Sequence, residues 1–86
     1  MRIFFHKQFE KRFKKLDIKT KKAFYRKLGL LSINTFHSEL NNHALKGRYK
    51  GYRSINITGD IRAIFIFLSE DSVEFDDIGN HNNLYN

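Results

Sequence analysis

The stretch YRSINITGDIRAIFIFL, residues 52–68, decides the fold. Polar and apolar side chains alternate over residues 52–57, whereas residues 61–68 are apolar at almost every position. This pattern predicts two strands, the second of which is covered on both faces. Thr58, Gly59 and Asp60 between them are typical of a turn, so the stretch predicts a β-hairpin.

The length of the turn sets the register of the hairpin. A three-residue loop over residues 58–60 places Ile57 opposite Ile61 and makes one face apolar. That apolar face carries Ile55, Ile57, Ile61, Ala63, Phe65 and Phe67. A two-residue loop would bury Asn56 beside Phe65, and the burial cost of the amide favours the three-residue loop.

The opposite face of the hairpin collects polar side chains. In the favoured register it carries Ser54 and Asn56 beside Arg62, and the turn holds Asp60 at its rim. We expect Asn56 and Arg62 to project together from the side of the sheet that helices leave uncovered.

The segments before the hairpin predict a strand and two short helices. Residues 2–5 are rich in β-branched and aromatic side chains, as in a strand. Apolar residues at helical spacing follow, and we expect them to form core: Phe9, Phe13 and Leu16, then Phe24, Leu28 and Leu31. Asp17 can cap the second helix. The two helices form a basic hairpin that can cover the apolar face of the sheet.

The segments on either side of the β-hairpin complete the predicted fold. Residues 34–51 lose periodicity and predict a loop with polar groups. A turn at residues 69–72 precedes a last strand, and a polar tail begins at Gly79. We therefore predict a single domain, residues 1–86, of the α+β class: an N-terminal strand and a two-helix hairpin packed on a small antiparallel sheet.

Composition bounds the class of protein. A chain of 86 residues, 41% hydrophobic and 15% aromatic, supplies one small core and excludes a multidomain architecture. The absence of Cys excludes disulfides and thiolate metal sites and favours the cytoplasm. No run approaches the roughly 18 apolar residues of a membrane span, so we expect neither a membrane segment nor a signal peptide.

Charge is divided unevenly along the chain. Residues 1–53 carry 15 Lys and Arg against three Asp and Glu, a net +12, whereas residues 54–86 have a net charge of −5. The basic half indicates a polyanionic partner, although a solvated helix face explains a basic run about equally well.

The residues that packing does not use resemble the active site of a ribonuclease. They are His43, Lys46, Arg48, Arg53, Asn56, Asp60, Arg62, His81 and Tyr85. Cleavage of RNA by its own 2′-hydroxyl needs a general base, a general acid and cations that stabilise the phosphorane. These requirements include no metal.

Each candidate has a role in that chemistry. His43 and His81 can serve as base and acid, because an unperturbed imidazole titrates near neutral pH. Asp60 can orient an imidazole, while Arg62 or Arg53 can hold the phosphate. The alternatives are that His43 is an ordinary surface residue and that Arg62 and Asp60 form a structural pair. A zinc site of His43, Asp60 and His81 lacks a spacing motif, so we expect no metal and no other cofactor.

Four blocks in order resemble the RelE superfamily of type II toxins, and within it the YafQ-like group. The blocks are NNHALKG at 41–47, GYRSINI at 51–57, GDIRAIF at 59–65 and IGNHNNLY at 78–85. The resemblance implies the RelE-like fold, in which a strand and two helices precede an antiparallel sheet. It also implies an endoribonuclease that enters the ribosomal A site and cuts mRNA, together with a cognate antitoxin and a heterotetramer of the two proteins.

The resemblance also assigns residues. The family's catalytic residues are similar to His43, Asp60 and His81, and its substrate-contacting aromatic residue is similar to Tyr85. Two positions depart from the pattern. Asn56 stands where YafQ-like toxins carry a further His, and an amide does not shuttle protons near neutral pH. Asn80 replaces a Thr before His81 and keeps a hydrogen-bonding side chain.

The leading hypothesis is therefore a toxin that inhibits translation as a ribosome-dependent mRNA interferase. Its basic helices would lie against ribosomal RNA phosphates while the loop and hairpin residues hold mRNA: Lys46, Arg48, Arg53, Asn56, Arg62 and Tyr85. Two alternatives stay open. One is a DNA gyrase poison of the ParE type, which would need no acid and base pair, and the other is an RNA-binding module without catalysis.

Overall fold

The central hairpin has the predicted register. In a computed structural model, which describes residues 1–85, β3 (Arg53–Asn56) pairs antiparallel with β4 (Ile61–Ser69). Asn56 lies opposite Arg62, and the Ile57 amide donates to the Ile61 carbonyl at 2.9 Å. The three-residue loop is confirmed, and the apolar face of the hairpin belongs to the core.

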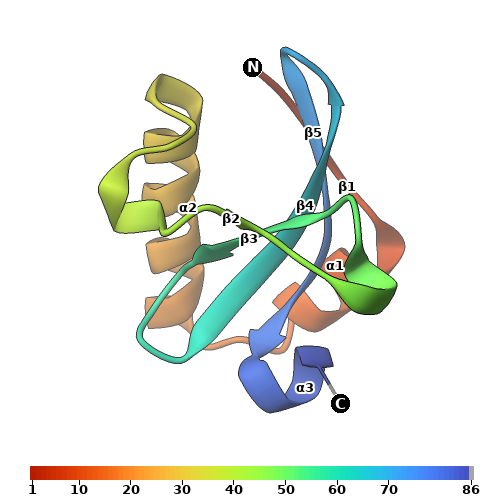
Figure 1. Cartoon of the computed structure of the whole chain (residues 1–86). Coiled ribbons are helices and arrows are strands. Elements are labelled where there is room, and N and C mark those ends of the chain that lie inside the picture. The colour runs from red at the N-terminus through yellow and green to blue at the C-terminus, as the bar shows by residue number, and fades with distance from the viewer. Residues whose placement is uncertain (86) are drawn as a thin grey trace.

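The sheet has five strands in the order β1-β5-β4-β3-β2 (Figure 1). β3, β4 and β5 (Ser72–Asn80) pair antiparallel, as predicted, and β2 (His43–Ala44), a strand within the predicted loop, pairs antiparallel with β3. β1 (Arg2–Phe5) instead pairs parallel with β5. The α+β class is confirmed, with a mixed sheet in place of a purely antiparallel one. Side-chain alternation specifies which face of a strand is buried and not its direction, so the pattern carried no signal for this pairing.

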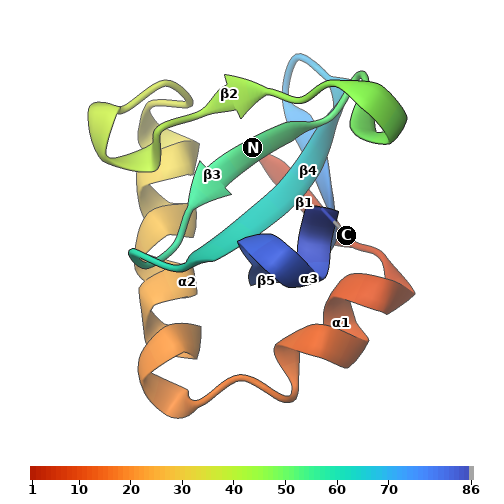
Figure 2. The ribbon, with the colours of Figure 1, turned by 60° about the horizontal axis from the view of Figure 1, so that its bottom comes forward.

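Both helices of the first half are capped as their sequences suggest. α1 (Lys7–Phe13) begins after His6, whose Nδ1 accepts from the Gln8 amide at 3.0 Å. α2 (Ile18–Ile33) begins after Asp17, whose carboxylate accepts from the Thr20 amide at 2.8 Å. Hydrogen bonding to the side chain of Thr20, together with its amide, lowers the pKa of Asp17. Figure 2 shows that the two helices spread apart from their short connection, with α1 under β5 and α2 beside β3 and β4.

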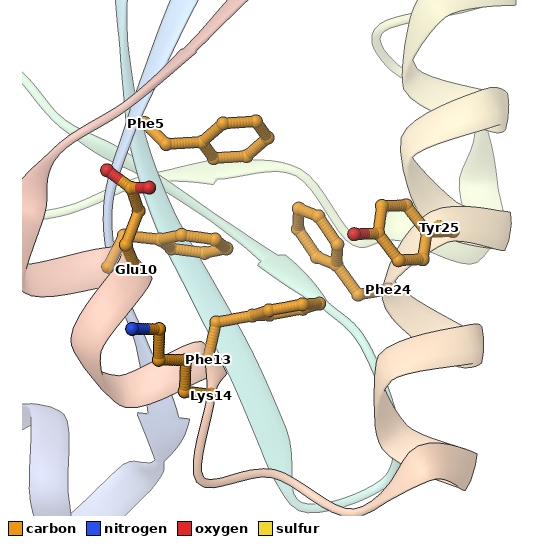
Figure 3. A pocket seen from close by; sticks show the side chains of 7 residues that line it. Phe5, Glu10, Phe13, Lys14, Phe24 and Tyr25 are labelled. Atoms are coloured by element: carbon orange, nitrogen blue, oxygen red, sulfur yellow. The ribbon is translucent and has the colours of Figure 1, made fainter.

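Aromatic rings fill the space between the two helices. Phe9 and Phe24 are buried, with ring centroids 5.3 Å apart, and both contact the ring of Phe75 from β5. Phe13 joins the cluster from the end of α1. The cluster opens at the surface in a pocket of about 190 Å³, which Tyr25 of α2 also lines (Figure 3). The aromatic residues predicted to be core are therefore core.

The second half of the chain holds more structure than predicted. The loop at 34–51 contains two 3-10 turns, η1 (Ser38–Leu40) and η2 (Gly47–Tyr49), on either side of β2. The polar tail predicted from Gly79 is wrong, because β5 continues to Asn80 and α3 (His81–Tyr85) follows. A single apolar side chain explains the difference: Leu84 is fully buried and holds α3 against the sheet. Among residues 1–85, no helix has the length and apolarity that a membrane crossing requires.

Candidate active site

A pocket of about 250 Å³ lies on the face of the sheet opposite the aromatic core. Its lining comes from β2, β3, β4, α3 and the segment after β2: His43, Leu45, Ser54, Arg62, His81 and Tyr85. Figure 2 shows α3 beside these strands, where the end of β5 delivers it. Four of the six lining residues are predicted site residues, so the fold brings together positions from both ends of the second half of the chain.

His43 enters the pocket from the short edge strand β2. It lies opposite Ser54 of β3, and its Nδ1 is 2.8 Å from the Asn41 carbonyl oxygen. A carbonyl oxygen only accepts, so Nδ1 carries the hydrogen in this contact. In the neutral ring Nε2 then keeps its lone pair and can accept a proton. Asn41 has a positive φ of 48°, a conformation that Asn adopts more readily than most residues.

His81 and Tyr85 enter the pocket from α3. They are one helical turn apart, and their ring centroids are separated by 4.7 Å. The Asn80 side chain accepts from the Asn83 amide at 2.8 Å and so caps the start of α3. The Arg48 guanidinium donates to the Leu84 carbonyl at 2.9 Å at its other end. Asn80, where the related toxins carry Thr, thus keeps a capping function that orients the helix bearing His81.

Arg62 supplies the permanent charge of the pocket. It is half-buried on β4, and its Nη1 donates to the carbonyl oxygens of Thr58 and Gly59 at 3.0 and 3.2 Å. These bonds brace the turn between β3 and β4. Among residues 1–85 no hydrogen bond or ion pair engages Nε or Nη2 of Arg62, which leaves donors for an anionic ligand.

Two polar atoms near the pocket are buried without a partner in the described part of the chain. They are Oγ of Ser54 and Oδ1 of Asn56, both on β3. A buried polar atom without a hydrogen bond costs about 1–3 kcal/mol. The sequence analysis placed Ser54 on this face, but it identified neither Ser54 nor Leu45 as a pocket residue. The alternation along β3 was the available signal for Ser54.

The remaining predicted site residues lie outside this pocket. Asp60 is exposed in the turn, and within residues 1–85 its carboxylate bonds to neither histidine. Arg53 donates from Nε to the Asn42 side chain at 2.6 Å and lies over the Phe36 ring. Asn56 is half-buried beside Arg62 but does not line the cavity.

Lys46 and Arg48 flank the pocket from the segment after β2. Lys46 is exposed immediately before η2. Arg48 ties that segment to α3 through the Leu84 carbonyl and lies over the Tyr49 ring at 5.1 Å. Among residues 1–85 no carboxylate lines the pocket, so its side chains favour an anionic ligand. Within the described residues no group of three His, Asp or Glu side chains lies close enough to hold a metal ion.

Solved structures share this fold. YafQ from E. coli is 22% identical with a TM-score of 0.73, and all of both chains is covered. The YoeB/ParE toxin from Agrobacterium tumefaciens is 18% identical with a TM-score of 0.79, over 94% of this chain and 99% of the other. YafQ in the E. coli DinJ-YafQ complex is 25% identical with a TM-score of 0.68, again over both whole chains.

A search of the curated proteins found no match. The family model described as the bacterial toxin of the type II toxin-antitoxin system, YafQ, matches residues 1–86. The match covers every strand and helix that builds the pocket. The chain therefore belongs to the YafQ family of type II toxins.

Proposed function

We propose that this toxin is an endoribonuclease that cleaves mRNA on the ribosome without a metal ion. One observation carries the proposal: His43 and His81, far apart in the sequence, line one pocket together with Arg62, and no carboxylate within residues 1–85 lines it. Two imidazoles and a guanidinium are the groups that cleavage of RNA by its own 2′-hydroxyl requires.

The hydrogen-bond arrangement supports His43 as the base in this proposal. His43 Nδ1 donates to the Asn41 carbonyl, so Nε2 takes the proton from the 2′-hydroxyl. The 2′-oxygen attacks the phosphorus, the bond from phosphorus to the 5′-oxygen breaks, and His81 donates a proton to that leaving oxygen. The products are a 2′,3′-cyclic phosphate and a free 5′-hydroxyl. This step balances without an oxidant or a cofactor.

Other side chains hold the RNA in this mechanism. The free donors of Arg62 neutralise charge on the phosphorane, and Tyr85 offers a ring face to a base. Lys46 and Arg48 extend the positive charge along the strand of RNA. Asp60 points into solvent from the turn, so its catalytic assignment stays a prediction drawn from the resemblance.

Two of the predicted site residues take no part in the proposed chemical step. Arg53 is held by Asn42 and Phe36, which favours a structural role over phosphate binding. Asn56 does not line the cavity, and its amide cannot serve as a proton carrier. The acid and base work therefore falls on His43 and His81 alone.

The exposed basic side chains of α1 and α2 favour docking on ribosomal RNA. The cations on these two helices include Lys7, Lys11, Lys19, Lys22 and Arg26, and all five are exposed. Contacts of this kind with phosphates are independent of sequence and weaken with salt. The helices would hold the toxin in the A site while the pocket contacts mRNA.

We also propose a cognate antitoxin that forms a heterotetramer with this chain in the cytoplasm. The support is the family to which the chain belongs and the E. coli complex of YafQ with DinJ, whose YafQ chain is 25% identical to this one. The basic helices suit an acidic segment that folds on binding. Binding should cover the catalytic pocket or those helices.

The test is primer extension on a reporter mRNA in a cell-free translation reaction, with and without ribosomes. Wild type is compared with His43→Ala plus His81→Ala. The matched control is His6→Asn plus His37→Asn, which removes two imidazoles outside the pocket and replaces each Nδ1 cap acceptor with a side-chain oxygen.

We expect cuts in phase with codons that need ribosomes, persist in the control and disappear in the double variant. Cleavage that survives in the double variant would remove the histidines from the mechanism. No cleavage by wild type would reject the nuclease, and a DNA supercoiling assay would then test the gyrase alternative.

A further inference from the structure

A second and larger cavity lies on the other side of α3 from the catalytic pocket. It encloses about 510 Å³ between α1, the start of β4, the end of β5 and α3. The residues that matter here are Arg12, Lys15, Ile61, Gly79, Asn80 and Asn83. The proposed mechanism uses none of their side chains in a chemical step.

The two cavities adjoin along the chain. Ile61 lines the second cavity and its neighbour Arg62 lines the catalytic pocket. Asn80 likewise lines the second cavity, and its neighbour His81 lines the catalytic pocket. Consecutive residues of a strand point to opposite faces of the sheet, so the two cavities lie on either side of the start of β4 and of α3, and an RNA strand would have to pass around this end of the sheet to reach both.

The charged lining of this cavity is cationic. Arg12 and Lys15 come from α1 and the segment after it, and no carboxylate is among the lining residues. Nε of Arg12 lies 3.4 Å from a buried Asp77 oxygen, which orients the guanidinium. Nη1 of Arg12 has no hydrogen-bond partner among residues 1–85, and Lys15 is exposed. Within residues 1–85 the Lys15 ammonium therefore has no ion-pair partner, whereas the charge of Arg12 is paired with Asp77.

The rest of the lining combines amides with apolar surface. Asn80 uses Oδ1 to cap α3, and its amide nitrogen and the side chain of Asn83 make no hydrogen bond in the described part of the chain. Ile61 and Ile78 are apolar. Gly79 adds no side chain to the wall between them, and a Cβ there would make ordinary van der Waals contacts, at 3.6 Å, with Arg12 Nη1 and with the Asn83 Cβ.

We propose that this cavity binds the nucleotide of the RNA substrate that adjoins the scissile phosphate. Lys15 and Arg12 hold its phosphate, the amides of Asn80 and Asn83 contact the base edge, and the apolar wall at Gly79 accepts the base face. The inference rests on the proposed nuclease function, because it takes the same RNA as ligand.

The experiment measures binding without cleavage. The probe is a fluorescent RNA trinucleotide with 2′-O-methyl groups, which removes the attacking hydroxyl. Its Kd is measured by anisotropy over a range of salt concentrations. Wild type is compared with Lys15→Gln, with Gly79→Val and with the control Lys14→Gln, whose lysine is also exposed and adjoins Lys15 in the sequence but lines neither cavity.

We expect Lys15→Gln to raise Kd about threefold to fivefold at low salt, the size of one exposed ion pair. The slope of log Kd against log salt should fall by about 0.7 for the one lost phosphate contact. Gly79→Val fills the wall and should raise Kd with an unchanged slope. Circular dichroism checks that each variant is folded, and Gly79→Ala replaces Gly79→Val if the larger side chain unfolds β5.

Three results separate the possibilities. Wild-type Kd and salt slope in Lys15→Gln and the folded Gly79 variant would overturn the inference, even if the toxin cuts mRNA. If these variants bind the RNA as wild type does but no longer bind an acidic peptide that wild type binds, the inference is also overturned and the cavity is assigned to a protein partner. Weakened RNA binding in these variants, with no cleavage by wild type on ribosomes, would retain the cavity as an RNA site and reject the nuclease.

Discussion

The two faces of the sheet are built from the same strands, but one face packs the core and the other lines the candidate pocket. On the core face, Ile55, Phe65 and Phe75 are fully buried and pack among the rings of the two helices. On the pocket face, Ser54 is buried to the same extent, yet its hydroxyl has no partner among residues 1–85. The side chains on the core face are packed on all sides, whereas the pocket face carries a hydroxyl that can still form a hydrogen bond.

This difference follows from the two-residue period of a strand. Neighbours such as Ser54 and Ile55 point to opposite faces, so one strand serves packing and chemistry at alternate positions. Substitutions on the core face should therefore change stability, whereas those on the pocket face should change activity. The following variants test this separation.

Phe75→Ala should give the largest loss of stability. Phe75 is fully buried and contacts four other phenylalanine rings, and removing such a side chain costs about 3–5 kcal/mol. Urea unfolding measures the loss. Cleavage per folded molecule at low temperature should match wild type. A stable variant with low activity would show that the core face also shapes the pocket.

His81→Ala should reduce cleavage by about 10²- to 10⁴-fold, the usual contribution of a general acid or base. Its side chain is exposed at the start of α3, so the melting temperature should not change. The bell-shaped pH dependence of kcat/KM should lose one limb. Asn82→Ala, also exposed on α3, is the matched control. An intact bell in His81→Ala would exclude His81 as the proton donor.

The hairpin register was predictable because a two-residue loop would turn the Asn56 side chain to the same face as Phe65, where burial of the amide costs free energy. The cap at Asp17 was predictable for a similar local reason. The parallel β1 and the helix α3 were not, since both depend on contacts between segments distant in the sequence. The burial of Leu84 against the sheet is one such contact.

The site was predictable in its residue types more than in its arrangement. His43 and His81 lie outside the apolar patterns of the sequence, so they could be identified as candidates. Their position in one pocket depends on the pairing of β2 with β3 and on the helix α3 that follows β5. Asp60 has the right chemistry for orienting an imidazole, yet the turn carries it outside the pocket lining. Spacing in the sequence does not contain these distances.

Ser54→Ala should raise the free energy of unfolding by about 1 kcal/mol, since it removes a buried hydroxyl without a partner. Cleavage should fall if that hydroxyl meets the substrate. Ser72→Ala is the control, because its hydroxyl has a partner in Ser69 at 2.7 Å and its removal should bring no gain. Equal stability changes in the two variants would indicate that Ser54 is not under strain in the free protein.

Asp77→Asn should give the smallest effect, visible only as a dependence on pH. Burial raises the pKa of Asp77, and the nearby Arg12 opposes this only in part. The folded state therefore holds this proton more tightly than the unfolded chain. The stability that it contributes is complete below about pH 4 and is lost as pH rises through the folded pKa.

The Asn side chain keeps an oxygen for the Ile78 amide, which donates to Asp77 at 2.9 Å, but it has no proton to lose. Melting temperatures of the two proteins should therefore converge in acid and separate above it, with Asp77→Asn gaining on wild type as pH rises. The opposite slope would mean that the ion pair with Arg12 outweighs burial. That result would place Asp77 among the groups that stabilise the fold, although it lies beside the cavity that we assign to RNA.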